Sequence, residues 1–155
     1  MKIAVFSDTH RRIEGAISAI RKYQPDLIIH LGDHYGDAAD IQNTFPDIPM
    51  ERVPGNCDYA PGVEPVRYIE PMGVRMMLCH GHTYNVKMEL LPLMNAACFS
   101  GSQIVMFGHT HEPLYRIVRG IHVLNPGTAG KGRHLTWATI ELEDGEIKDI
   151  RLRDI

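Results

Sequence analysis

The sequence predicts an α/β fold in which two mixed β-sheets pack together with helices on the outside. In the first half of the chain, short apolar runs alternate with segments of helical period, which is typical of parallel strands joined by helices. In the second half, apolar runs follow one another through short turns, which is typical of hairpins. The 155 residues are 44% hydrophobic and contain no repeat or linker, so we expect one domain over residues 1–155.

The first half contains three predicted strands and two predicted helices in alternation. Apolar runs predict buried strands over residues 2–8, 26–33 and 50–56. Apolar residues recur at helical spacing over residues 13–23, and a shorter helix is expected over residues 36–45. This order favours parallel pairing of the strands.

The second half contains three predicted hairpins, one helix and one further strand. The helix covers residues 85–99, and we expect Pro92 to kink it. Gly108 and Pro113 mark the end of the strand. The hairpins are expected over residues 66–82, 114–127 and 135–155, and the strand over residues 104–111.

Composition and charge exclude several classes of protein. The net charge is −3 with 23% charged residues, so no basic excess indicates nucleic-acid binding. The apolar run at the N-terminus is too short for a signal peptide, and proline and polar residues interrupt the uncharged stretch 90–108, so we expect no membrane span. Three cysteines without close spacing favour a reducing cytoplasm over a disulfide framework.

Five of the apolar runs end in residues that can bind a metal ion. In open α/β sheets, ligand sites lie beyond the carboxyl ends of the strands, so these side chains are expected to converge. His109 and His111 are two residues apart, and on an extended chain such residues point to the same side. The candidate ligands are Asp8, His10, Asp33, Asn56, His80, His109 and His111.

Each of these positions taken alone has an ordinary structural explanation. Asp8 or Asp33 would serve as a helix N-cap, and Asn56 after a glycine is typical of a turn. His30 and Cys79 are expected to be packed rather than functional. These explanations do not account for the same kind of ending at five strands, and therefore we favour a metal site.

Seven ligands are more than one catalytic ion takes. An open catalytic site holds one divalent ion with about three protein ligands, so seven suit two ions that share a carboxylate. Nitrogen and oxygen ligands without a thiolate favour Mn²⁺, Fe, Zn²⁺ or Co²⁺ over Ca²⁺ or an iron–sulfur cluster.

Five short motifs resemble, in sequence and in order, those of the calcineurin-like metallophosphoesterases: SDTH, LGD, GNCD, HGH and GHTH. The small size and the later motif NPG (125–127) are most similar to the compact bacterial and archaeal phosphodiesterase branch. The resemblance covers residues 8–127 and implies a four-layer α/β/β/α sandwich, with a two-metal site at one edge of the sheets.

The same resemblance implies a role for each ligand. Asp8, His10 and His111 would hold one ion, Asn56, His80 and His109 the other, and Asp33 would bridge the two. A hydroxide that bridges both ions would attack phosphorus in line, so the catalytic centre is expected at Asp33, Asn56, His10 and His109. The expected cofactor is two divalent ions per chain, Mn²⁺ first, with Ni²⁺, Co²⁺, Fe and Zn²⁺ as alternatives.

Cys57 departs from the pattern of many family members, which carry a histidine there as the general acid. We interpret Cys57 as a small packed residue. Alternatively, its protonated thiol could donate a proton to the leaving group, as could His82 or His34. Esters with good leaving groups would need no proton donor. The candidate substrate contacts are Arg11, His34, Cys57, Asp58 and His82.

The expected function is hydrolysis of a small phosphoester, most of all a phosphodiester. The alternative is a binding scaffold of this fold without catalysis, similar to the retromer small subunit, which lacks part of the ligand set. All seven ligands are present here, which favours the enzyme. A homo-oligomer is compatible with the sequence.

Overall fold

The structure, a computed structural model, describes residues 1–155 and contains ten strands, three α-helices and two short 3₁₀ helices. In chain order these are β1 (Lys2–Phe6), α1 (Glu14–Tyr23), β2 (Leu27–His30), α2 (Tyr35–Thr44), β3 (Met50–Arg52), β4 (Val66–Ile69), η1 (Pro71–Gly73), β5 (Met76–Cys79), η2 (His82–Tyr84), α3 (Leu91–Phe99), β6 (Ile104–Met106), β7 (Leu114–Val118), β8 (Ile121–Asn125), β9 (Thr136–Glu143) and β10 (Glu146–Asp154).

The strands form two mixed sheets of five strands each. The first has the order β10-β9-β1-β2-β3, and the second has the order β4-β5-β6-β8-β7. Strands β1, β2 and β3 pair in parallel, as the alternation of strands and helices predicted, and β9 and β10 add antiparallel neighbours. In the second sheet β5, β6 and β8 are parallel, and the predicted hairpins supply antiparallel edge strands β4 and β7.

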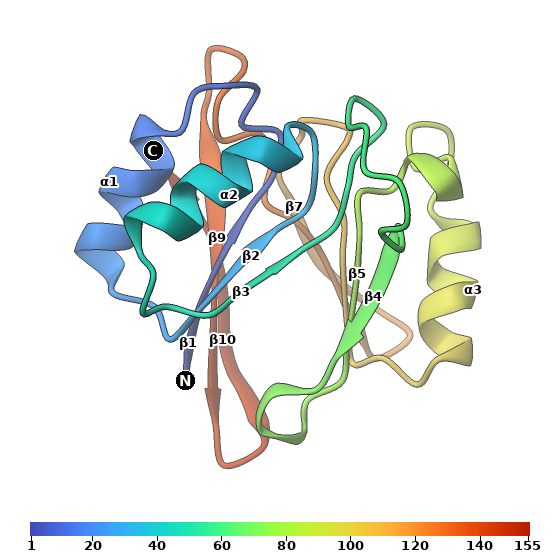
Figure 1. Ribbon diagram of the computed structural model, residues 1–155. Helices are drawn as coiled ribbons and strands as arrows, with labels where there is room; N and C mark the ends of the chain where they lie inside the picture. The colour runs from blue at the N-terminus through green and yellow to red at the C-terminus, as the bar shows by residue number, and fades with distance from the viewer.

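The two sheets pack face to face, and helices cover their outer faces. Helices α1 and α2 lie on one side of the sheets and α3 on the opposite side (Figure 1). Alternate residues of β1 divide between two layers: Ile3 and Val5 join a core between the sheets, whereas Ala4 and Phe6 pack with α1 and α2. A third apolar cluster fills the space under α3. The four-layer α/β/β/α sandwich is therefore confirmed.

The predicted kink at Pro92 is wrong. Helix α3 begins at Leu91, and Pro92 lies in its first turn, while residues 85–88 form turns ahead of the helix. The first turn tolerates proline because its backbone N–H groups have no partner within the helix, so the missing donor costs nothing. None of the helices is both long enough and apolar enough to cross a membrane.

Candidate metal centre

The predicted ligands lie on loops rather than on the strands themselves. Strand β1 ends at Phe6, β2 at His30 and β6 at Met106, so each strand stops two or three residues before the first ligand that follows it. Several of these loop residues have a left-handed backbone, which is uncommon outside glycine and occurs most often at functional sites. They include Asp8 (φ 56°), His10 (φ 46°), Asp33 (φ 56°), His109 (φ 67°) and His111 (φ 62°).

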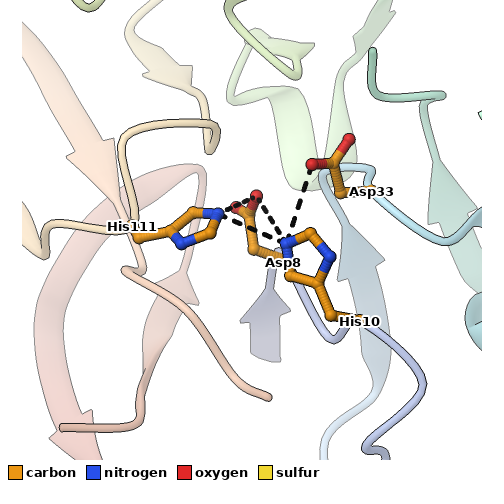
Figure 2. A group of neighbouring side chains, drawn as sticks. All are labelled: Asp8, His10, Asp33 and His111. Atoms are coloured by element: carbon orange, nitrogen blue, oxygen red, sulfur yellow. Dashed lines mark hydrogen bonds and ion pairs between the residues drawn. The ribbon is translucent and has the colours of Figure 1, made fainter. Parts of the chain in front are cut away.

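Four of the predicted ligands converge on one point. Asp8, His10, Asp33 and His111 each offer one ligand atom, and these atoms all lie within 4.8 Å of one another. His111 Nε2 is 3.0 Å from Asp8 Oδ1, and the His10 and His111 Nε2 atoms are 3.3 Å apart. Figure 2 shows the four side chains pointing toward one another. A group of two imidazoles and two carboxylates at this spacing can hold a divalent cation.

Asp33 belongs to this group and also faces a second group, which consists of histidines. Its Oδ2 is 3.7 Å from His10 Nε2, and its Oδ1 is 3.3 Å from His80 Nε2. The ring of His80 in turn lies 5.1 Å from that of His109 and 5.5 Å from that of His82. The two oxygens of Asp33 thus face different sets of imidazoles.

Asp8 is fully buried, and its two oxygens have different environments. Oδ2 accepts hydrogen bonds from Ser7 Oγ at 2.5 Å and from the backbone N–H of His109 at 3.1 Å. Oδ1 is also buried and has no hydrogen-bond partner. His111 Nε2 lies 3.0 Å from this oxygen without a hydrogen bond between them, and a cation held by both atoms would satisfy a buried carboxylate oxygen that is otherwise costly.

His80 presents a second buried atom without a partner. Its Nδ1 is 2.7 Å from the carbonyl oxygen of Leu31, which can only accept, so Nδ1 carries the proton. In the neutral ring Nε2 is then a free lone pair, and this atom is buried and unpartnered. A histidine that ligates a metal ordinarily donates its other N–H to a carbonyl or carboxylate in this way. The donors present therefore fit a divalent cation beside Asp8, and His80 offers a free lone pair on the other side of Asp33.

The protonation states at neutral pH also suit a cation. Burial, followed by the neighbouring His80, lowers the pKa of His109 to about 4. Burial lowers the pKa of His10 against the opposing effect of Asp33. Burial raises the pKa of Asp33, but His80 and the backbone N–H of Cys57 outweigh it and leave that pKa lowered. Neutral imidazoles and an ionised carboxylate are the forms that bind metal ions.

The loop that carries Asn56 and Cys57 contacts Asp33 through its backbone. The backbone N–H of Cys57 donates to Asp33 Oδ1 at 3.1 Å, and the amide nitrogen of Asn56 is 3.5 Å from Cys57 Sγ. Both side chains are exposed. The interpretation of Cys57 as a packed residue is therefore wrong, because the residue is exposed and its backbone N–H contacts Asp33.

Asp58 anchors the same loop to α2. Its two oxygens accept from the backbone N–H groups of Tyr35 at 2.7 Å and Gly55 at 2.8 Å. Both carboxylate oxygens of Asp58, which is a predicted substrate contact, therefore have hydrogen-bond partners within the protein. The structure also shows that neither Asp8 nor Asp33 is an N-cap, since α1 and α2 are preceded by Ile13 and His34.

The other predicted substrate contacts lie around the site. The ring of His34 is 5.2 Å from that of His10, and His34 and Arg11 both line a polar cavity of about 550 Å³. On the other side, His82 has a buried Nδ1 without a partner, and its ring lies 6.2 Å from that of His109. A larger cavity of about 650 Å³ lies elsewhere, between α1 and the end of β10.

Sequence reasoning missed the residues that set the position of Asp8. A side chain at Gly108 would collide with Ser7 Oγ and come within 2.7 Å of Asp8 Oδ2, so only glycine fits there. Asn125 donates to the carbonyl oxygen of Gly108 at 2.9 Å and to Thr110 Oγ1 at 3.0 Å. Gly108 and the NPG motif were visible in the sequence, but their role depends on contacts between distant segments.

Comparison with known proteins places this geometry in context. The family model described as the calcineurin-like phosphoesterase superfamily domain matches residues 1–145. A probable metallophosphoesterase from Methanothermobacter thermautotrophicus is 32% identical over 162 residues, covering 98% of this chain and 91% of the relative. A probable metallophosphoesterase from Mycoplasma pneumoniae is 29% identical over 158 residues, covering 96% of this chain and 94% of the relative.

Solved structures share the fold at lower sequence identity. A structure described as a novel archaeal phosphodiesterase superimposes with a TM-score of 0.77 at 22% identity, over 100% of both chains. Vps29 from Entamoeba histolytica, crystallised with Zn²⁺, superimposes with a TM-score of 0.80 at 18% identity, over 100% of this chain and 98% of that chain. At these identities the two structures are similar in fold alone.

Proposed function

The chain belongs to the calcineurin-like phosphoesterase superfamily, and we propose that it is a metal-dependent phosphodiesterase whose site holds two divalent ions. The observation that carries this proposal is the position of Asp33, whose two oxygens face His10 on one side and His80 on the other. The proposal treats residues 1–155 as a single metallophosphoesterase domain.

The proposed ligand sets follow from the two groups of side chains around Asp33. Asp8, His10 and His111 would hold the first ion, and their convergence with Asp33 supports this set. Asn56, His80 and His109 would hold the second, with the free Nε2 of His80 as its best supported member. Asn56 is exposed, so its amide can turn either toward an ion or toward a substrate. Mn²⁺ is the ion we propose first, since it accepts this mixture of nitrogen and oxygen ligands.

When bound, two divalent ions supply a water nucleophile at neutral pH and neutralise charge on the phosphoryl oxygens. The chain orients this chemistry through its own rigid contacts. Ser7 and the backbone N–H of His109 hold Asp8, and the backbone N–H of Cys57 holds Asp33. The Asn56 amide would donate to a phosphoryl oxygen as negative charge builds there.

Residue 57 supplies no strong acid that would protonate the leaving group. Desolvation, followed by the neighbouring Asp33 carboxylate, raises the pKa of the Cys57 thiol. A thiol that holds its proton this firmly is a weak acid, so we propose that esters with good leaving groups react fastest. His82 and His34 are the other candidate proton donors, with rings 5.5 Å from that of His80 and 5.2 Å from that of His10.

A diester is the substrate class that the surroundings support. The cavity of about 550 Å³ beside His34 and Arg11 can receive the second substituent of a phosphodiester. The same fold occurs in an archaeal phosphodiesterase, which agrees with this assignment. We place the protein in the cytoplasm, and its three free cysteines suit a reducing compartment.

The test combines metal analysis with a substrate panel. Metal-free protein saturated with Mn²⁺ and then desalted should retain about two equivalents per chain, as a site of seven ligands predicts. Mn²⁺ should restore activity after chelation, and diesters should be cleaved faster than monoesters. One tightly held equivalent with full activity would contradict the dinuclear proposal, and preference for monoesters would contradict the substrate class.

The second candidate function is a binding scaffold without catalysis. The observation that favours it is the similarity in fold to Vps29, a structure of which contains Zn²⁺. Metal uptake alone therefore does not separate the two functions, but turnover does. Protein that binds two ions and hydrolyses no ester in the panel would favour the scaffold.

A further inference from the structure

A buried hydrogen-bond network adjoins the loop that carries Asp8 and His10, and the proposed chemistry uses none of its members. It consists of Thr9 on that loop, His30 at the end of β2 and Asp37 in the first turn of α2. Thr9 and His30 are 0% exposed and Asp37 is 8% exposed. Buried polar networks whose hydrogen bonds are satisfied rigidify the segments that they join.

The hydrogen bonds of the network run in a single direction. The backbone N–H of Gly32 donates to His30 Nδ1 at 3.2 Å, so Nδ1 must accept. The neutral ring then carries its proton on Nε2, which donates to Thr9 Oγ1 at 3.1 Å. The hydroxyl of Thr9 donates to Asp37 Oδ2 at 2.6 Å. The neutral state of the ring agrees with its burial, which lowers the pKa of His30 to about 4.

Asp37 holds the loop on both sides of His10. Its Oδ2 accepts from the Thr9 hydroxyl and also from the backbone N–H of Arg11 at 2.7 Å. The loop has a left-handed backbone at Asp8, His10 and Arg11, with φ values of 56°, 46° and 66°. Residues other than glycine adopt this conformation at an energetic cost, so they need surrounding contacts to keep them in it.

We propose that Thr9, Asp37 and His30 are positioning residues, which hold the loop so that Asp8 and His10 are already arranged for a cation. The network joins the loop to β2 and α2, and the Gly32 amide that begins it precedes Asp33 directly. One network thus connects the loop of the first ion to the loop of the proposed bridging carboxylate. This inference rests on the proposed function for the identity of the bound ion.

The first arm of the test uses metal-free protein and hydrogen exchange. Thr9→Val keeps the shape of the side chain and removes the hydroxyl, so the amides of residues 9–12 should exchange faster than in the wild type. Thr9→Ser restores the hydroxyl and should restore the protection. Thr139→Val is the matched control, because Thr139 is 1% exposed and lies on β9, where it bonds Arg153. It should leave the exchange of residues 9–12 unchanged.

The second arm measures Mn²⁺ binding by calorimetry. Loss of a partner that orients a ligand costs about 10–100-fold in metal affinity, so Thr9→Val and Asp37→Asn should weaken one of two sites by this factor. The other site, built around His80, should keep its wild-type affinity. Thr9→Ser should restore the weakened site, whereas a residue with a merely structural role would change the stability of the fold without this selectivity.

The outcomes separate the two proposals. Wild-type protein that binds no divalent ion would overturn the proposed function. Normal binding of two ions by the wild type and by Thr9→Val, with unchanged exchange in the loop, would overturn the positioning role alone. Equal losses in Thr9→Val and Thr139→Val would also overturn it, because the effect would then be general destabilisation.

Discussion

Asp33 Oδ1 lies 3.3 Å from His80 Nε2, and His80 Nε2 is buried without a hydrogen-bond partner. The opposite oxygen of Asp33 faces His10. A carboxylate between two sets of imidazoles places negative charge where the two proposed cations would otherwise repel each other. Substitution of Asp33 is therefore the most direct test of the site.

Asp33→Asn should weaken both metal sites at once. The substitution keeps the shape of the side chain but removes the charge that both ions would share. Affinity and turnover should each fall by more than the roughly 10–100-fold that loss of an outer partner of a ligand costs. A two-site Mn²⁺ isotherm and kcat measurements with a nitrophenyl diester provide the check.

The matched control is Asp149→Asn, the same change on β10, where the carboxylate pairs with Arg151. It should bind Mn²⁺ and turn over as the wild type does. If Asp33→Asn kept near-normal activity at ordinary Mn²⁺ concentrations, a different carboxylate would have to be the bridge.

Gly108→Ala should reduce both stability and metal affinity. The new methyl group would meet Ser7 Oγ and Asp8 Oδ2, so either Asp8 or the GHTH loop must move. Overpacking of this kind costs about 1–3 kcal/mol in the free energy of unfolding. Urea unfolding and Mn²⁺ titration measure the two effects.

Gly36→Ala is the control for this change, because a side chain at Gly36 meets nothing within 4 Å. Gly36 lies in α2, where alanine is the better helix former, so stability should stay the same or rise. Equal behaviour of the two variants would mean that the loop has room for a side chain beside Asp8.

Cys57→Ser should change the rate little, because Cys57 binds Asp33 through its backbone N–H and its side chain is exposed. Without a strong general acid, kcat/KM should depend steeply on the pKa of the leaving group, and aryl diesters should react much faster than alkyl diesters. A general acid contributes about 10²–10⁴-fold, mostly for basic leaving groups.

Kinetics with a series of esters, in the wild type and in Cys57→Ser, test this expectation. A flat dependence on the leaving group in the wild type, combined with a large loss in Cys57→Ser, would identify the thiol as the proton donor. If residue 57 supplies no general acid, Cys57→His should help alkyl esters more than aryl esters.

Acid should destabilise the metal-free protein through His30. Burial lowers the pKa of His30 to about 4 from its ordinary value of 6.5. Below pH 6.5 His30 binds a proton in the unfolded chain, whereas in the folded chain it binds one only near pH 4. The free energy of unfolding therefore decreases as the pH falls from 6.5 to about 4. The loss is on the order of 3 kcal/mol for this residue.

Urea unfolding in the presence of a chelator, at neutral pH and near pH 4.5, measures this effect. His30→Gln cannot titrate, so its stability should depend less on pH than that of the wild type. The absolute stability of the variant does not matter for this comparison. An unchanged pH dependence in His30→Gln would assign the acid sensitivity to other buried histidines.

Much of the fold followed from local sequence patterns. Apolar runs, helical spacing and turn residues predicted the strands, the helices and the hairpins, because each pattern depends on neighbours in the chain. Local patterns were less informative about where an element begins. Pro92 was read as a kink, whereas in the structure it lies in the first turn of α3.

The candidate ligands were also evident from the sequence, since each strand end places its polar residue beyond the sheet. Their arrangement depended on tertiary structure. Asp8 and His111 are 103 positions apart, yet their ligand atoms lie 3.0 Å from each other because β1 and β6 end at the same edge of the packed sheets. Only this packing shows that Asp33 stands between two sets of histidines.

The sequence by itself determined the candidate metal ligands of this protein, because metal-binding residue types at the ends of apolar strands can be read along the chain. The tertiary structure decided which atoms are free to act. It left Cys57 exposed, engaged both oxygens of Asp58, and left Asp8 Oδ1 and His80 Nε2 buried without hydrogen-bond partners. Burial and hydrogen-bond satisfaction depend on contacts between segments far apart in the chain, and no local pattern specifies them.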